Sequence, residues 1–269
     1  MKKLTFYLFR LYLLFISLIK LLFFFIHLSA IKCFVHKLSV LLLDYYKDTE
    51  TNLSSFTQSK FYQDRESKLC WAKTSVLSSC WGNLHAQEIS FLSTIVSEVS
   101  ARTIFEFGTY NGYANVHHSK KTSPQSTIYT IDLPREDTAQ DMKRLSLIQA
   151  HDDMRTVKVA RDLGVGTLFA QRQEYPNIIQ LFGDTLMYDF SPWFGKIDLC
   201  FIDAAHSYQY VKSDSENAFK MLSERGVLVW HDFDVNHYDV FRYLNTLAKN
   251  KKLFWIENTR LVVYFSSDS

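Results

Sequence analysis

The sequence predicts an α/β fold, in which a mostly parallel sheet carries helices on both faces and ends in an antiparallel hairpin. Short apolar runs alternate with helical patterns after residue 100, and one run passes through a glycine-containing loop directly into a helix. The last two apolar runs, residues 253–256 and 261–265, are separated only by a short turn. Alternating strands and helices favour a parallel sheet, whereas two strands joined by a turn favour a hairpin.

Length and charge limit the class of protein. The 269 residues, 47% hydrophobic and 22% charged, suffice for one large domain with an appendage and differ from a disordered chain. Residues 1–43 hold six Lys and Arg and no acid, which leaves 24 basic against 28 acidic residues in the remainder. A mildly acidic body argues against nucleic acid as a partner. The four scattered Cys form no C-x-x-C pair and indicate a reduced, cytoplasmic protein.

The chain divides into three predicted parts. Residues 1–43 form a hydrophobic N-terminal helix, residues 44–100 a linker with lead-in helices, and residues 101–269 the main domain. The N-terminal helix lacks Gly and Pro, but charged residues such as Lys20 interrupt it. It could lie in or span a membrane through residues 4–31, act as an uncleaved signal-like leader, or be a packed helix or start-site artefact. These alternatives stay open. We therefore expect a cytoplasmic protein, and its association with a membrane through the N-terminal helix is one of the alternatives.

A glycine-containing loop follows the first strand predicted in the main domain, residues 103–107. Gly108 and Gly112 flank this loop and Glu106 precedes it, so the pattern is E-x-G-x-x-x-G. Glycine lets the backbone approach a ligand, and the free amides at the start of the next helix bind polar groups. A dinucleotide fingerprint would require glycine at position 110, where Tyr110 stands. The loop therefore predicts a ligand site that matches the dinucleotide pattern poorly.

Acidic residues follow three further predicted strands. They are Asp132 after residues 127–131, Asp184 after residues 177–182, and Asp203 after residues 197–202. Open α/β sheets bind ligands at the carboxyl ends of their strands, and an acid after the second strand can accept hydrogen bonds from both ribose hydroxyls. The long insertion between the second and third strands, residues 133–176, is either a lid over the ligand or a solvated helical excursion.

Residues 197–234 carry the most specific pattern, which is a strand, Asp-x-x-His, a helix, a glycine turn and a strand closed by His231-Asp232. With the E-x-G-x-x-x-G motif, this region resembles the class I S-adenosylmethionine-dependent methyltransferases, in their Methyltransf_24-like branch, over about residues 101–269. The resemblance implies a Rossmann-like sheet of seven strands and S-adenosylmethionine as the cofactor. It also implies a set of cofactor-binding residues, which are Glu106, Gly108, Thr109, Tyr110, Gly112, Asp132 and Asp184.

The same resemblance implies catalytic residues and a metal site. His206 could take a proton from a hydroxyl acceptor, because imidazole titrates near neutral pH, and Asp203 lies three residues before it. Asp203, Asp232 and His231 could hold Mg²⁺ or another divalent metal that acidifies the hydroxyl. Metal-dependent relatives carry two acids where this chain has His231-Asp232, and His is a poor Mg²⁺ ligand. Fewer carboxylate ligands, a softer metal and no metal are therefore alternatives.

We expect an S-adenosylmethionine-dependent methyltransferase that acts on an oxygen of a small molecule or glycan. Two alternatives stay open, namely a metal-dependent hydroxylase-like member of the same fold and a membrane-tethered protein that binds the cofactor without catalysis. The acceptor and the oligomeric state do not follow from the sequence, because the insertion and loops that would contact an acceptor have no recognisable chemistry.

Overall fold

The computed structural model describes residues 54–56, 82–134, 162 and 164–266. The predicted N-terminal helix and most of the predicted insertion lie outside these residues, so neither the membrane interpretations nor the lid is tested. In the part of the chain that is described, no helix is long and apolar enough to cross a membrane. The elements that follow all belong to one compact unit, Asn52–Ser269.

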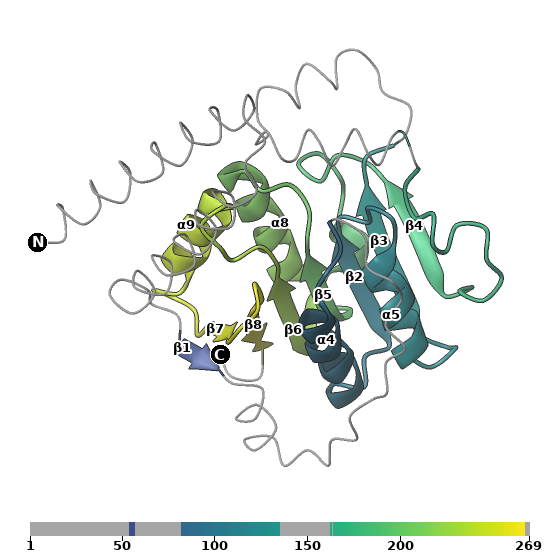
Figure 1. The fold of residues 1–269 in the computed structure, drawn as a ribbon, viewed down its shortest axis with the longest axis horizontal. Coiled ribbons are helices and arrows are strands. Elements are labelled where there is room, and N and C mark those ends of the chain that lie inside the picture. Colours follow the sequence, from purple (N-terminus) through teal and green to yellow (C-terminus); the bar gives the residue numbers. More distant parts are fainter. Residues whose placement is uncertain (1–53, 57–81, 135–161, 163, 267–269) are drawn as a thin grey trace, which may run out of the picture. The chain divides into compact units, whose positions relative to one another are not determined.

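Eight strands form one sheet, in the order β1-β7-β8-β6-β5-β2-β3-β4 (Figure 1). The strands are β1 (Ser54–Phe56), β2 (Thr103–Phe107), β3 (Thr127–Asp132), β4 (Ile178–Phe182), β5 (Ile197–Ile202), β6 (Leu222–Trp230), β7 (Phe254–Ile256) and β8 (Val262–Phe265). Strands β2 to β6 pair in parallel, and β8 is antiparallel to both β6 and β7. The predicted parallel sheet and closing hairpin are confirmed. The eighth strand, β1, pairs with β7 and lies in the segment predicted as a linker.

Helices cover both faces of this sheet (Figure 1). Among the described residues they are α4 (Ala86–Glu98), α5 (Tyr113–Lys121), α8 (Tyr208–Met221) and α9 (Tyr238–Leu247), with a 3₁₀ turn at Ser191–Trp193. Successive strand side chains point to opposite faces, so every second residue meets the same helix layer. Ile104, Leu199 and Val229 share one core with the apolar side of α4. On the other face, the indole nitrogen of Trp230 donates to Ser215 Oγ of α8 at 2.8 Å.

Two glycines shape the loop after β2. Gly108 has a φ of +90°, and a β-carbon there would lie 2.0 Å from the carbonyl oxygen of Asp203. Gly112 has a φ of +86°, and its β-carbon would lie 2.5 Å from the ring of Phe169. Glycine alone meets both demands, because it adopts positive φ without strain and has no β-carbon. The loop therefore lies directly against the end of β5, where Asp203 follows the strand.

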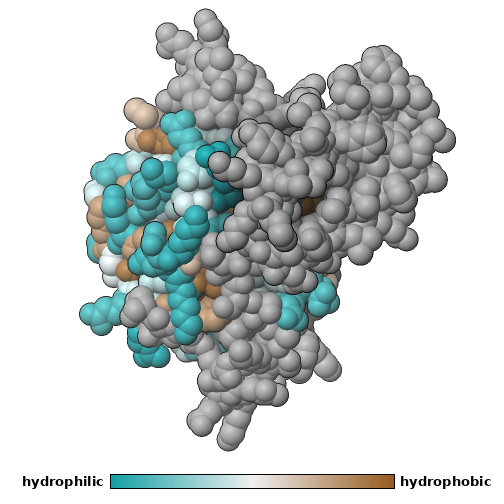
Figure 2. Space-filling model, turned by 90° about the vertical axis from the view of Figure 1, so that its left-hand side faces the viewer, coloured by the Kyte–Doolittle hydropathy of each residue, from teal (hydrophilic) through white to brown (hydrophobic). Residues whose placement is uncertain are grey.

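Strand β4, at the edge of the sheet, carries two of the four exposed large hydrophobic side chains among the described residues, Ile179 and Phe182. Met187 and Phe194 follow it in the chain. On the face drawn in Figure 2, hydrophilic residues predominate and hydrophobic ones are interspersed among them. The strand interiors, by contrast, bury nearly all of their apolar side chains, as expected for a sheet covered on both faces.

Candidate functional site

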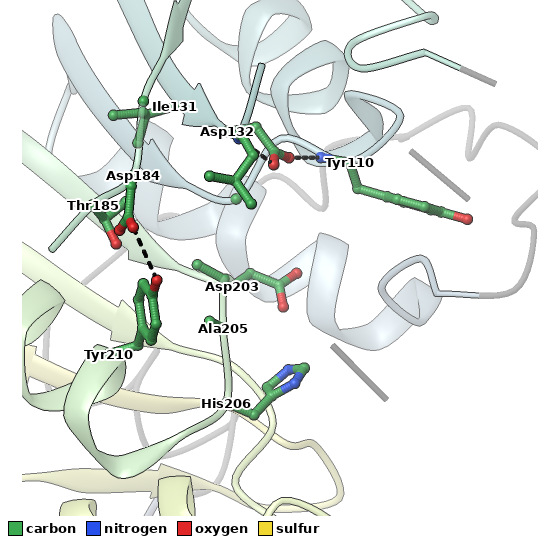
Figure 3. A pocket seen from close by; sticks show the side chains of 13 residues that line it. Tyr110, Ile131, Asp132, Asp184, Thr185, Asp203, Ala205, His206 and Tyr210 are labelled. Carbon is green, nitrogen blue, oxygen red and sulfur yellow. Dashed lines mark hydrogen bonds between the residues drawn. The ribbon is translucent and has the colours of Figure 1, made fainter. Parts of the chain in front are cut away.

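A pocket lies at the carboxyl ends of β2, β3, β4 and β5 (Figure 3). It is lined by Gly108, Tyr110, Ile131, Asp132, Leu133, Gly183, Asp184, Thr185, Asp203, Ala204, Ala205, His206 and Tyr210. Three of these residues are Asp, and none of the described lining residues is Lys or Arg. The lining therefore favours a neutral or positively charged ligand and disfavours a phosphate.

Asp132 connects the end of β3 to the glycine loop. Its Oδ2 atom accepts hydrogen bonds from the backbone amides of Thr109, at 3.0 Å, and Tyr110, at 2.8 Å. Its Oδ1 atom accepts a third from the amide of Leu133 at 2.7 Å. Burial raises the pKa of Asp132 above its ordinary value, and the three amides act against that rise. The carboxylate thus holds the loop in place and lines the pocket, in the position expected for a ribose acceptor.

Asp184, which follows β4, also lines the pocket, and Figure 3 shows it facing Tyr210. The hydroxyl of Tyr210 donates to Asp184 Oδ2 at 3.2 Å, and the amide of Leu186 donates to Oδ1 at 2.9 Å. Sequence reasoning selected Asp184 but not Tyr210. The spacing of Tyr210, in the first turn of the helix after β5, gives no signal that its hydroxyl would reach the end of β4.

The other predicted cofactor residues separate into two groups. Gly108 and Tyr110 line the pocket with the two acids, whereas Glu106, Thr109 and Gly112 are absent from its described lining. Glu106 is buried, and its Oε2 atom has no hydrogen-bond partner among the described residues. Burial and the nearby acids Asp203 and Asp132 raise the pKa of Glu106 well above its ordinary value. These three residues therefore lie outside the pocket lining, and their predicted contact with the cofactor stays a prediction.

A cluster of charged side chains joins the ends of β5 and β6, beside the pocket. The Nε2 atom of His206 lies 2.7 Å from Asp232 Oδ2, and the Nδ1 atom of His231 lies 2.9 Å from Asp203 Oδ1. The structure thus brings together the four residues expected to be catalytic or metal ligands. Asp232 also has a φ of +58°, which non-glycine residues rarely adopt and which concentrates at functional sites.

Two further members of the cluster, Glu88 and Arg260, do not follow from the sequence analysis. The Nη1 atom of Arg260 donates to Asp232 Oδ1 at 2.6 Å, and its backbone amide donates to Glu88 Oε1 at 3.0 Å. Glu88 has a side chain only 1% exposed, and its Oε2 atom lies 3.3 Å from His231 Nε2. One signal could have found it: Glu88 stands four residues before Leu92, on the apolar side of its helix, where an unpaired acid would be costly.

The charges in this cluster stabilise one another. Burial acts to lower the pKa of His231, but Asp203 and Asp232 raise it well above the ordinary value. Burial acts to raise the pKa of Glu88, but His231 and Arg260 lower it to about 2. The pKa of Asp232 is held well below its ordinary value by His231 and His206, against the effect of burial. At neutral pH, His231 is therefore protonated, and the carboxylates of Glu88 and Asp232 are ionised.

The predicted metal ligands have donor atoms within 4.8 Å of one another, but these atoms are already engaged. Both ring nitrogens of His231 face carboxylates, and a protonated imidazole has no lone pair for a metal. The guanidinium of Arg260 lies on Asp232 Oδ1. A divalent ion would have to displace two cations, so this donor set does not fit one.

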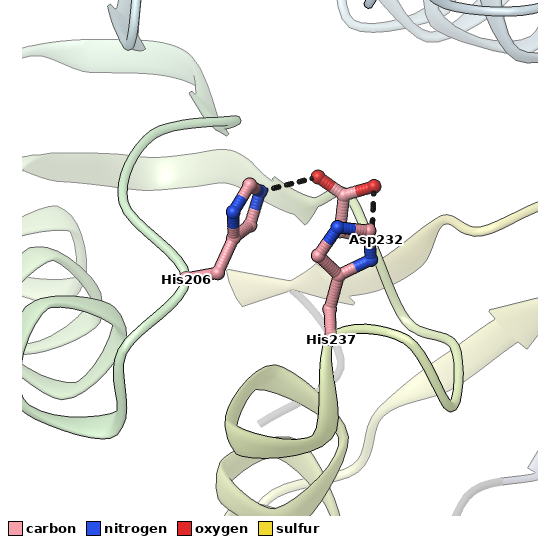
Figure 4. A group of neighbouring side chains, drawn as sticks. All are labelled: His206, Asp232 and His237. Atoms are coloured by element: carbon pink, nitrogen blue, oxygen red, sulfur yellow. Dashed lines mark hydrogen bonds and ion pairs between the residues drawn. The ribbon is translucent and has the colours of Figure 1, made fainter. Parts of the chain in front are cut away.

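A second group with donor atoms close together is His206, Asp232 and His237 (Figure 4). It depends on the same Asp232 carboxylate and therefore meets the same guanidinium. The Nδ1 atom of His237 lies 3.0 Å from Asp234 Oδ1 and 3.5 Å from Asp232 Oδ1, so it already faces two acids.

The fold and the pocket define a Rossmann-like α/β domain with a ligand site at the carboxyl edge of its parallel strands. Without β1, the strand order is β7-β8-β6-β5-β2-β3-β4, which is the predicted seven-stranded sheet. Residues 105–233 match the family model described as a methyltransferase domain. The chain therefore carries a methyltransferase domain over this segment, as expected from the sequence.

No curated protein matches this chain. Solved structures that resemble it include a cofactor-bound protein from MTB, with 17% identity, coverage of 68% of this chain and 81% of the other, and a TM-score of 0.45. An O-methyltransferase from Streptomyces achromogenes in complex with SAM has 14% identity, coverage of 83% and 95%, and a TM-score of 0.43. An O-methyltransferase from Bacillus cereus in complex with SAH has 14% identity, coverage of 84% and 97%, and a TM-score of 0.44.

Proposed function

We propose that the chain is an S-adenosylmethionine-dependent methyltransferase that transfers its methyl group to an oxygen of a small molecule or glycan. The observation that carries this proposal is the pocket lining, which has three Asp and, among the described residues, no Lys or Arg. S-adenosylmethionine has a positive sulfonium and no phosphate, so it suits such a lining. A dinucleotide would bring phosphates towards these acids and be repelled.

The chain offers matching groups for the rest of this cofactor. Asp132 would accept hydrogen bonds from the ribose hydroxyls, because each carboxylate oxygen can accept more than one. Ile131 and Leu133 flank Asp132 and provide an apolar surface for the adenine ring, and Asp184 would accept from its amino group. When bound, the cofactor supplies an electrophilic methyl group on sulfur.

His206 is the residue that we propose as the general base. Since Asp232 can only accept a hydrogen bond at neutral pH, the Nε2 atom of His206 carries the proton and the lone pair lies on Nδ1. His206 would take the proton of the acceptor hydroxyl when that oxygen receives the methyl group, and the imidazole would keep this proton until product release. Asp232 orients the imidazole and stabilises its positive charge after proton transfer.

The predicted divalent metal is not part of this proposal, because Arg260 and His231 already occupy its donors. Membrane association through residues 4–31 stays a prediction, as does a glycan rather than a small molecule as the acceptor.

Calorimetric titration of S-adenosylhomocysteine into the full chain tests the cofactor, and transfer of a labelled methyl group to a small-molecule extract tests the reaction. We expect binding and a product heavier by one CH₂ group at an oxygen. A hydroxylated product would favour the hydroxylase-like alternative. Binding without turnover, unchanged in His206→Gln, would favour a binding protein without catalysis. If wild type does not bind, the proposal fails.

A further inference from the structure

The carboxylates that end β5 and β6 are held by cations that belong to the chain itself. This inference rests on the proposed function. We propose that Arg260 and His231 replace a divalent metal ion at this site, holding Asp232 and Asp203 in position so that methyl transfer proceeds without a metal.

Arg260 is fixed at two points. Its backbone amide bonds to Glu88 of α4 at 3.0 Å, and its guanidinium bonds to Asp232 at the end of β6 at 2.6 Å. It lies in the turn between β7 and β8, so the closing hairpin of the sheet delivers it to the site. Because its side chain is only 29% exposed, its charge is partly shielded from solvent and acts strongly on the acids beside it.

His231 completes the arrangement on the other side of Asp232. Its two ring nitrogens bridge Asp203, at 2.9 Å, and Glu88, at 3.3 Å, and its Nδ1 atom lies 3.3 Å from Asp232 Oδ2. The carboxylates of Asp203 and Asp232 have oxygen atoms within 4.8 Å of each other, so they would repel without a cation between them. In many proteins a bound metal ion supplies that cation. Here a protonated imidazole stands between the acids instead.

The carboxylates of the cluster already have cationic partners within the chain. Glu88, Asp203 and Asp232 face the side chains of His231 and Arg260. A divalent ion would have to displace these partners from the same carboxylates. Asp232, held in this way, in turn lies 2.7 Å from the Nε2 atom of His206.

Arg260 is accordingly a positioning residue, which acts on His206 through Asp232. The test is titration of the full chain with Mn²⁺, a paramagnetic probe of divalent sites, followed by electron paramagnetic resonance. We expect no site in wild type. Arg260→Gln, which removes the guanidinium from Asp232 Oδ1, should bind Mn²⁺ at least about tenfold more tightly than the detection limit that bounds wild type. The gain should vanish in Arg260→Gln/Asp232→Asn. Arg225→Gln, at an exposed arginine of β6, is the matched control and should behave as wild type.

Two results would overturn the inference. One is a stoichiometric Mn²⁺ site in wild type that disappears in Asp203→Asn. The other is a folded Arg260→Gln variant that gains no Mn²⁺ binding. If Arg260→Gln does not fold, the experiment uses Arg260→Met instead, because Met retains an apolar stem like that of the arginine side chain. A parallel titration with S-adenosylhomocysteine separates this test from the proposed function. If wild type does not bind S-adenosylhomocysteine, the proposed function is rejected, whereas the Mn²⁺ titration still tests whether Arg260 excludes a divalent ion.

Discussion

The Nε2 atom of His206 lies 2.7 Å from Oδ2 of Asp232, across a separation of 26 positions in the sequence. His206 comes from the loop after β5 and Asp232 from the end of β6, which are neighbours in the sheet. Parallel strands bring their carboxyl ends to the same edge, so the two loops meet there. In the proposed function, this contact places the proton of His206 on Nε2 and makes Asp232 the residue that orients the base.

Replacing the base should separate binding from chemistry. We expect His206→Gln to lower the rate of methyl transfer about 100-fold or more, because general base catalysis contributes at least that factor. Asp232→Asn should also lower the rate, since an amide can favour the wrong tautomer of His206. Cofactor affinity should change little in His206→Gln. Single-turnover transfer and calorimetry measure the two quantities. His85→Gln, at an exposed histidine that starts α4, is the control, and an unchanged rate in His206→Gln would exclude it as the base.

Removal of the Asp132 carboxylate should weaken cofactor binding. It would take away the proposed ribose acceptor and the two hydrogen bonds that hold the loop of Thr109 and Tyr110, together with a third from the amide of Leu133. We expect Asp132→Ala to weaken S-adenosylhomocysteine binding about 100-fold, as for the loss of charged hydrogen bonds. Asp189→Ala, at an exposed acid, should bind as wild type does. Equal affinity for the two variants would reject the role of Asp132.

Gly108 and Gly195 both have a positive φ, and comparing them tests the close contact between the loop after β2 and Asp203 after β5. A β-carbon on Gly108 would meet the Asp203 carbonyl, whereas one on Gly195, with a φ of +70°, would have nothing described within 4 Å. We expect Gly195→Ala to lower the free energy of unfolding by about 1 kcal/mol, from backbone strain alone. Gly108→Ala should lower it by at least about 3 kcal/mol or prevent folding. Urea denaturation measures both, and similar losses would contradict the close approach of Gly108 to Asp203.

The buried Asp214 of α8 should make stability depend on pH. Burial raises the pKa of Asp214 from 3.8 to about 7, and a contact with the Thr185 side chain opposes that rise only in part. Above pH 3.8 the unfolded chain ionises first, so this residue reduces stability progressively up to about pH 7 and by a constant amount beyond.

Asp214→Asn removes this penalty. We expect the variant to be more stable than wild type at pH 8, by up to about 4 kcal/mol, and to show no gain at pH 3. Denaturation at several pH values gives the difference directly. The exposed variant Asp189→Asn is the control. A gain for Asp214→Asn that does not vary with pH would show that packing, and not ionisation, sets its effect.

Much of the fold could be predicted because its signals are local. The runs at 103–107, 127–131 and 197–202 are short and mostly apolar, and each is bounded by polar or glycine residues. The antiparallel hairpin follows from two apolar runs around a short turn. β1 has no such signal, since its three residues, Ser-Ser-Phe, lie in a polar stretch and form a strand only against β7.

The site could be predicted where each residue ends a strand. Asp132, Asp184 and Asp203 are of this kind, and all three line the pocket. Glu88 and Arg260 could not be predicted in the same way, because Glu88 lies in α4, before β2, and Arg260 lies in the turn between β7 and β8. Their hydrogen bond spans 172 positions, and no local periodicity reports so distant a contact.

That separation also affects the order in which the molecule assembles. Strand β8, which follows Arg260, inserts between β6 and β7, and contacts between distant parts of a chain form slowly because a long loop must close first. The strands around the pocket come from the earlier stretch 103–202. During refolding from urea, we therefore expect the chain to regain affinity for its cofactor in an early phase and its catalytic competence only in a later one.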